Sequence, residues 1–472
     1  MAAKKNNSKS KKNNNTIKKS DIKKIKKAAK KAPKGLIIFI VIIIIAGLVG
    51  AGIWLYKSGK FDEWFNNKGK PTQTTTITSN KPVEEKEDGI IENIIYDDFQ
   101  IHFLELGNDA AGDSIYIKAG DNDILIDAGS RASSAKTIKT YVDNYCKDNK
   151  LEFVIGTHGD QDHISGMFGT KEKNGYNGIL YTYNIGTIIK QAYTTKTTST
   201  YNNYLAGIDY AVENGAKCYT AAECFNNKNG AKRTYTLAEN ITMDIIYNYY
   251  YFNNTTDDEN NYSVCTMFNY NDKHFLLTGD LELEGETEMA KYYDGSTKEK
   301  TLPKVELFKA GHHGSKTSSN ECLLRLIEPK ICVACCCAGT SEYTNNLEHQ
   351  FPTQAFINRI AVYTSRVYVT SMIKFIDNEW KFTSMNGNIV VSSNGDKIAL
   401  NASNNLTRLK DTEWFNEKIY AVKTNATYTW NEAKDKFPVY QNCPKAGSYD
   451  FYTKDTEGAV LIPRRTWPQN GK

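Results

Sequence analysis

The longest apolar run of the chain extends from Gly35 to Tyr56 and contains no charged residue. About 22 residues at a rise of 1.5 Å per residue span a hydrocarbon core about 30 Å thick. Trp54 and Tyr56 lie where a membrane interface favours aromatic side chains. The apolar region of a cleaved signal peptide is shorter, about 7–15 residues. The run therefore predicts one transmembrane helix.

Residues 57–92 are polar and lack hydrophobic periodicity, which predicts a linker. Alternating apolar positions begin near Ile94 and predict strands at 101–106, 115–120, 124–129, 151–158, 241–249, 263–270, 274–280, 304–311, 330–336 and 366–371. Helical patterns occur at 133–147, 198–216, 281–292, 318–327 and 353–360. Interleaved strands and helices predict an α/β layered domain over residues 93–400. Residues 401–472 are weakly patterned, and either an appended module or a wrap on the main domain fits them.

Charge is unevenly distributed along the chain. Residues 1–34 contain fourteen Lys and one Asp, a net charge of +13, so the total of +5 leaves −8 for residues 35–472. Because positive flanks stay in the cytoplasm, we expect this basic tail inside and the domain outside, in a single-pass protein of the cell membrane. The tail also suits anionic lipid headgroups. The acidic remainder does not indicate the basic face of a nucleic-acid-binding protein.

The ten cysteines do not form the pattern of a disulfide scaffold. Cys332 and Cys335 have CxxC spacing, but they lie in the apolar run 330–338, and no second CxxC is present to complete a zinc knuckle. We interpret them as small thiols in a buried strand.

Three short segments concentrate His and Asp at the ends of predicted strands. They are 157–163 (THGDQDH), 276–280 (LLTGD) and 310–315 (AGHHGS), and the first and third contain four of the seven histidines. Each unpaired buried carboxylate costs several kcal/mol, and a bound cation offsets that cost. The three segments together predict a metal site.

This motif set resembles the metallo-β-lactamase superfamily, and more narrowly the soluble domain of ComEC-type DNA-uptake proteins. Further matching segments are 103–107 with 112–114, 125–129, 260–263, His349 with Pro352, and 387–391. The resemblance covers about residues 99–400. It implies an αββα sandwich and a metal-dependent hydrolase.

The resemblance also implies a role for individual residues. His158 and Asp160 would hold one metal ion, Asp162 and His163 would hold a second, and Asp280 would bridge the two. One of two neighbouring histidines completes the second site; the candidates are His312, which we slightly favour, and His313.

Supporting roles follow for residues around these ligands. Asp127 is expected to orient a ligand. His349 either faces the leaving group or a phosphate oxygen, or is a solvated surface histidine. Ser315 and Asp113 are weaker candidates.

Two departures from the superfamily pattern affect the metal content. Asp160 replaces the second histidine of HxHxDH, and no histidine occurs from 164 to 273, so the first site lacks a ligand. Carboxylate oxygen in place of imidazole shifts the preference of a site toward Mn²⁺. We expect one firmly held Zn²⁺ and a second, exchangeable ion, with Mn²⁺ raising activity.

Two divalent ions suit phosphodiester hydrolysis by metal-bound hydroxide, because they offset charge on the nonbridging oxygens. Asp162, Asp280 and His349 are the catalytic candidates. The alternatives are a nuclease accessory to DNA uptake, an esterase acting on phosphocholine in the cell wall or on lipids, and a degenerate module that binds a cell-surface polymer through the Tyr-rich segment 247–252. The membrane and a phosphoester are the expected partners, and no protein partner is inferred.

Overall fold

The computed structural model describes residues 89–173, 175–340, 350–376 and 379–416, together with two short paired strands, β20 (Thr453–Lys454) and β21 (Val460–Leu461). The predicted tail, transmembrane helix and most of the linker lie outside these residues, as do His349 and most of 401–472. Within the described ranges, no helix is long and apolar enough to cross a membrane.

The first large sheet has the strand order β1-β19-β18-β2-β3-β4-β5-β8-β9. Its strands are β1 (Ile90–Glu92), β2 (Phe99–Phe103), β3 (Ile115–Ala119), β4 (Asn122–Ile126), β5 (Lys150–Gly156), β8 (Asn184–Lys190), β9 (Lys217–Thr220), β18 (Ile389–Ser393) and β19 (Ile398–Ala402). From β4 to β9 the neighbours are parallel, so their carboxyl ends share one edge of the sheet.

The second large sheet has the order β10-β11-β12-β13-β14-β15-β16-β17. Its strands are β10 (Thr234–Ala238), β11 (Ile241–Ile245), β12 (Thr266–Tyr270), β13 (Lys273–Leu277), β14 (Leu307–Lys309), β15 (Ile331–Ala338), β16 (Val367–Ile376) and β17 (Glu379–Ser384). The strands from β13 to β16 are parallel. A two-stranded hairpin, β6 (Lys171–Glu172) with β7 (Gly175–Tyr176), lies apart from both sheets.

A shared hydrophobic core joins the two sheets face to face. Alternate apolar side chains of each sheet enter it, and the rings of Phe99 on β2 and Phe275 on β13 lie 5.0 Å apart. Both residues are fully buried. Side chains that alternate in this way place one face of each strand in the core.

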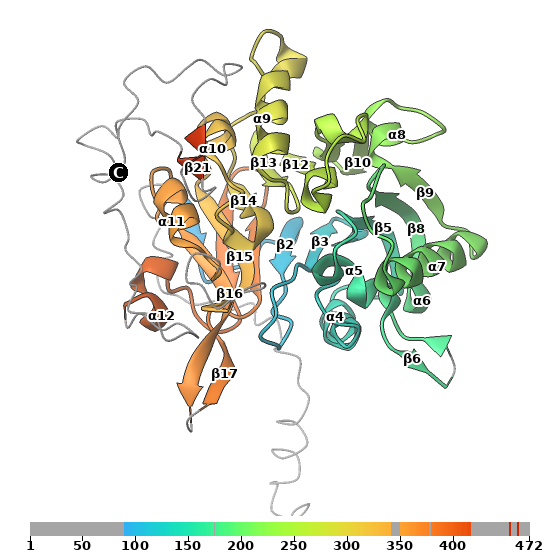
Figure 1. The fold of residues 1–472 in the computed structure, drawn as a ribbon, viewed down its shortest axis with the longest axis horizontal. Coiled ribbons are helices and arrows are strands. Elements are labelled where there is room, and N and C mark those ends of the chain that lie inside the picture. Colours follow the sequence, from blue (N-terminus) through green and yellow to red (C-terminus); the bar gives the residue numbers. More distant parts are fainter. Residues whose placement is uncertain are drawn as a thin grey trace, which may run out of the picture. The chain divides into compact units, whose positions relative to one another are not determined.

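Helices cover the outer faces of both sheets (Figure 1). Those packed on the first sheet are α4 (Ser134–Val142), α5 (Gln161–Phe168), α6 (Ile179–Thr182) and α7 (Ser199–Glu213). Those packed on the second are α9 (Leu283–Tyr292), α10 (Glu321–Ile327), α11 (Gln354–Ile360) and α12 (Glu413–Asn416). Helix α8 (Ala221–Phe225) instead contributes to the core between the sheets. The domain is the predicted αββα sandwich.

The ends of the domain extend further than the sequence pattern indicates. Strand β1 begins at Ile90, inside the predicted linker, and pairs with β19, which lies more than 300 residues later in the chain. Leu409 and Trp414 are fully buried in the hydrophobic cluster of the second sheet and its helices, so the start of segment 401–472 packs on the main domain. The prediction of buried thiols is confirmed, because β15 is buried throughout and Cys332 and Cys335 are free.

Candidate metal centre

The first motif lies between β5 and α5 of the first sheet. Strand β5 ends at Gly156, and α5 begins at Gln161 with Asp160 as its N-cap residue. His158 and His163 are fully buried, with ring centroids 4.1 Å apart. Because Asp162 and His163 occupy the first turn of α5, their side chains point toward the carboxyl end of β5. The helix N-terminus there also favours a negative side chain.

The second and third motifs follow β13 and β14 of the second sheet. Asp280 comes three residues after β13, and His313 lies in the 3₁₀ turn η4 (Gly311–Gly314) after β14. Neighbouring parallel strands end at the same edge, so the two side chains meet, with His313 Nε2 3.1 Å from Asp280 Oδ2. His312 and His313 both have positive φ, 43° and 55°. Such φ values are unusual for residues with a side chain and often mark functional sites.

Four buried side chains from both sheets converge, with ligand atoms all within 4.8 Å of one another; they are Asp162, His163, Asp280 and His313. We call this set the ligand group. His163 Nε2 lies 3.1 Å from Asp280 Oδ2, and His313 Nε2 lies 2.9 Å from Asp162 Oδ2. Two imidazole nitrogens and two carboxylate oxygens form a donor set that suits a divalent cation such as Zn²⁺.

His313, rather than the slightly favoured His312, enters the ligand group. His312 Nδ1 instead lies 2.8 Å from Glu282 Oε1 and 3.4 Å from Asn260 Nδ2. The two rings have different neighbours, since His313 Nε2 lies 2.9 Å from Asp162 Oδ2, and the sequence alone did not separate them. His312 remains close enough for its charge to lower the pKa of His158, after burial and the charge of His163.

His158 and Asp160 lie beside the ligand group but outside it. His158 Nε2 is buried, accepts no hydrogen bond from the described residues, and is 3.6 Å from Asp160 Oδ2. The other oxygen of Asp160 forms an ion pair with Lys196. An orphaned imidazole nitrogen facing a carboxylate fits a second cation, although only two ligands are present there.

Asp127 fixes the orientation of His163. Asp127 Oδ2 lies 2.7 Å from His163 Nδ1 and accepts the Thr157 hydroxyl at 2.7 Å, while Asp127 Oδ1 accepts the Thr157 N–H at 2.8 Å. A carboxylate on Nδ1 leaves Nε2 directed at the ligand group.

Lys309 and Asp113 lie directly behind the ligand group. Lys309 was not predicted from the sequence, and Asp113 was one of the weaker candidates. The Nζ of the fully buried Lys309 lies 3.0 Å from Asp280 Oδ1 and 2.5 Å from Asp113 Oδ2. Asp113 Oδ1 in turn lies 3.2 Å from His313 Nδ1. The sequence signal that could have revealed this role is a lysine at the end of an apolar strand, four residues before His313.

Burial alone would lower the pKa of His163 and His313, but the negative charge of Asp280 and its neighbours raises both. Burial would raise the pKa of Asp162 and Asp280, yet the positive charge of His163 and His313 lowers both. The carboxylates of the ligand group are therefore held ionised, which is the form in which a carboxylate binds a cation.

The remaining candidates lie elsewhere. Ser315 Oγ is 3.0 Å from Thr317 Oγ1 and outside the ligand group. His349 falls in the segment 341–349, outside the described residues.

Comparison with known families agrees with this geometry. Residues 107–194, which include the first motif, match the profile of the metallo-beta-lactamase superfamily. Residues 107–194 are therefore similar to part of a metallo-β-lactamase domain. The superfamily resemblance predicted from the sequence is confirmed.

Two proteins from competence systems are similar to part of this chain. The chain is 33% identical over 97 residues to Competence protein ComA of Neisseria gonorrhoeae, covering 21% of this chain and 12% of the relative. It is 30% identical over 122 residues to ComE operon protein 3 of Bacillus subtilis, covering 26% of this chain and 14% of the relative. The solved metallo-beta-lactamase fold protein YhfI of Bacillus subtilis is 11% identical, with a TM-score of 0.29, covering 57% of this chain and 87% of that chain. This chain thus aligns with a small part of each competence protein.

Proposed function

We propose that this protein is a metal-dependent phosphodiesterase, anchored by residues 35–56 to the outer face of the cell membrane. The observation that carries the proposal is the ligand group, in which four buried side chains from both sheets converge within 4.8 Å. Burying two carboxylates and two imidazoles together is costly unless a cation balances them. A divalent ion bound there would lower the pKa of water to about 7 and supply hydroxide at neutral pH.

The chain's own residues prepare the site for this chemistry. Lys309 holds one oxygen of Asp280 and leaves the other directed at His163 and His313. Asp127 fixes the ring of His163 in the same way. These contacts hold the ligand atoms in fixed positions, so the atoms are pre-organised for a cation.

Lys196 supports a phosphodiester rather than a neutral ester as substrate. Its side chain is 28% exposed and pairs with Asp160 beside His158. A lysine at this position presents positive charge to an anionic substrate oxygen. The Lys196 ammonium group also offsets the negative charge of Asp160, so the site is not uniformly negative.

The test is hydrolysis by the full-length protein in non-ionic detergent, with Zn²⁺, Mn²⁺ or chelator. The substrates are bis(p-nitrophenyl) phosphate, a chromogenic phosphocholine ester, p-nitrophenyl acetate and single-stranded DNA. Metal-dependent cleavage of phosphodiesters supports the proposal, whereas cleavage of the acetate alone contradicts it. Topology is tested separately, by protease access to the domain in intact cells.

A nuclease role in DNA uptake is a second candidate, because two relatives are named as competence proteins. The net charge of −8 over residues 35–472 weighs against strong binding of nucleic acid. Single-stranded DNA in the same substrate panel separates the two candidates: a nuclease cleaves it at least as fast as the small chromogenic diester.

A further inference from the structure

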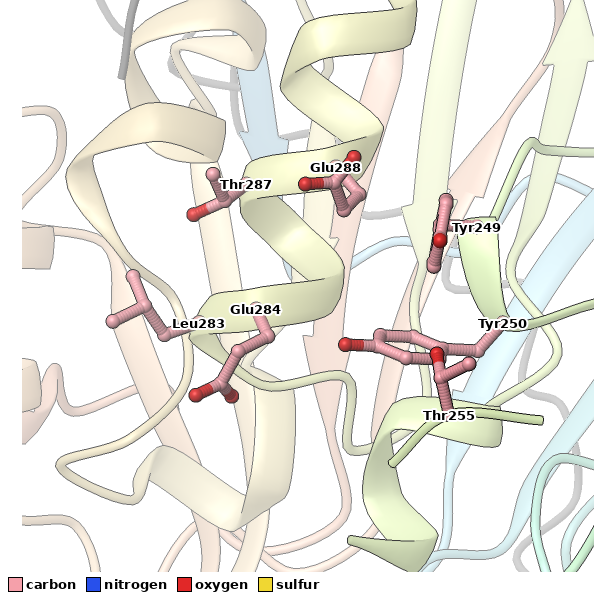
Figure 2. Close-up of a pocket in the computed structure, with 7 residues that line it drawn as sticks. All are labelled: Tyr249, Tyr250, Thr255, Leu283, Glu284, Thr287 and Glu288. Atoms are coloured by element: carbon pink, nitrogen blue, oxygen red, sulfur yellow. The ribbon is translucent and has the colours of Figure 1, made fainter. Parts of the chain in front are cut away.

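A cavity of about 470 Å³ opens between α9 and the 3₁₀ turn η1 (Tyr249–Tyr251). Its lining residues are Tyr249, Tyr250, Thr255, Leu283, Glu284, Thr287 and Glu288. Figure 2 shows the two tyrosines on one side and the α9 side chains on the other. The four-residue spacing of Glu284 and Glu288 places both carboxylates on one face of the helix.

Tyr250 lines the cavity with both its ring and its hydroxyl group. The residue is 8% exposed, and its hydroxyl makes no hydrogen bond with the described residues. The hydroxyl points across the cavity toward α9 (Figure 2). The ring of Tyr250 is thus held in the wall of the cavity, and its hydroxyl is open to the cavity.

The two tyrosine rings and the two carboxylates line the same cavity. The rings of Tyr249 and Tyr250 are perpendicular, with centroids 5.2 Å apart. Burial, followed by the negative charges of Glu284 and Glu288, raises the pKa of Tyr250 to about 12. The field of both carboxylates therefore reaches the Tyr250 hydroxyl.

The negative charge of the cavity lining favours a positively charged ligand. No Lys or Arg is among the lining residues. Glu288 forms an ion pair with Lys291, and Glu284 accepts a hydrogen bond from Asn261 at 3.5 Å, which leaves Glu284 without a cation in the described structure. A phosphate or another anion would meet uncompensated negative charge.

The lining of the cavity also suits an organic cation better than a metal ion. Within the described ranges, Glu284 and Glu288 belong to none of the clusters of three or more converging acidic, His or Cys side chains. Calcium takes six to eight oxygen ligands, whereas tyrosine rings and the Leu283 side chain form part of this wall. Aromatic faces next to carboxylates are typical of sites for alkylammonium groups.

We propose that this cavity binds an alkylammonium group, with the tyrosine rings contacting the cation and Glu284 balancing its charge. The cavity adjoins the metal centre along the chain: Leu283 follows Glu282, which contacts His312. Binding of the cation itself does not depend on the proposed hydrolysis.

The experiment is saturation-transfer NMR on the full-length protein in non-ionic detergent, titrated with tetramethylammonium, methylammonium or the neutral isostere 3,3-dimethylbutan-1-ol. We expect either ammonium ion to bind and the neutral alcohol to bind at least about tenfold more weakly. Tighter binding of tetramethylammonium assigns the larger role to the rings, and tighter binding of methylammonium assigns it to the oxygen atoms.

Variants locate the binding. Glu284→Gln should weaken it about tenfold, because an exposed carboxylate is lost without disturbing the core. Tyr250→Leu should abolish it, while Tyr250→Phe, which keeps the ring, should retain most of it. Glu213→Gln, an exposed position on α7, is the matched control. Equal affinity for the neutral alcohol, or unchanged affinity in a folded Glu284→Gln protein, would overturn the proposal whether or not the protein hydrolyses phosphodiesters.

Discussion

Lys309 and Asp280 form a buried ion pair, with Nζ 3.0 Å from Oδ1, directly behind the candidate metal ligands. The same ammonium group lies 2.5 Å from Asp113 Oδ2 and donates to the Gly279 carbonyl at 3.1 Å. Burial would lower the pKa of Lys309, but Asp113 and Asp280 raise it, so the lysine stays charged. One permanent cation therefore restrains the carboxylate that contacts both histidines of the ligand group.

Lys309→Met should lower the free energy of unfolding of the metal-free protein by about 3–5 kcal/mol, because two buried carboxylates lose their counter-charge. Zn²⁺ at about one hundred times its dissociation constant should restore about 2.7 kcal/mol. Urea unfolding with and without Zn²⁺ measures both effects. Lys136→Met, at an exposed position of α4, is the control. A loss under about 1 kcal/mol would show that Lys309 does not compensate these charges.

Asp280→Ala should abolish turnover, since Asp280 Oδ2 contacts both histidines of the ligand group. We expect a fall in kcat of at least about a thousandfold, about 4 kcal/mol, with bound metal lost as well. The measurements are initial rates and metal content by atomic absorption. Asp272→Ala, whose side chain is 79% exposed at the turn before β13, should leave both unchanged. Activity within about tenfold of the original would remove Asp280 from the site.

The layered fold and most of the ligand group could be predicted from the sequence, because both depend on local patterns. A strand that ends on a carboxylate, such as 274–280, displays period-two burial and a polar terminus at once. The structure places four of the seven predicted metal-ligand candidates in one cluster.

The remaining features depend on contacts between distant segments, which no local pattern encodes. The choice between His312 and His313 follows from the turn after β14, where Glu282 lies 2.8 Å from one ring and Asp162 lies 2.9 Å from the other. The pairing of Lys196 with Asp160 links residues 36 positions apart. Strand β1 was missed because its three residues acquire a partner only when β19 folds beside them.

Metal binding should release protons and strengthen as pH rises. The folded pKa values of His163 and His313 lie above 6.5, so their protonation stabilises the metal-free fold fully below pH 6.5, and this contribution is lost as pH rises through the raised values. The pKa values of Asp162 and Asp280 lie below 3.8, so their contribution is present above pH 3.8 and lost as pH falls through the lowered values. A metal ion must displace the imidazole protons, so affinity should rise about tenfold per pH unit for each proton released.

Calorimetric titration of Zn²⁺ in two buffers of different ionisation enthalpy counts those protons directly. A dissociation constant measured at pH 5.5, 6.5 and 7.5 gives the slope independently. Two released protons would assign both imidazoles to the ion. No proton release, together with a flat pH profile, would mean that neither histidine is charged before the metal binds.

The last prediction concerns the weaker metal position, where His158 and Asp160 are the two candidate ligands. Asp160 Oδ2 lies 3.6 Å from the orphaned His158 Nε2, while Oδ1 is held by Lys196. The ammonium group both occupies one ligand oxygen and repels an incoming cation. Lys196→Met should therefore tighten the second equivalent of Mn²⁺ by about tenfold and leave the first equivalent of Zn²⁺ unchanged.

Lys196→Arg, which keeps the charge, is the matched control and should bind the second ion as weakly as the original protein. Asp160→His should instead raise Zn²⁺ affinity at this position and reduce the stimulation by Mn²⁺, because an imidazole replaces a carboxylate. Titration of the metal-free protein with each ion measures the stoichiometry and both dissociation constants. We expect the position at His158 and Asp160 to bind Zn²⁺ more weakly than the ligand group, because it has two ligands and a neighbouring ammonium instead of four ligands. Two equally tight Zn²⁺ sites in the unmodified protein would contradict this difference in affinity.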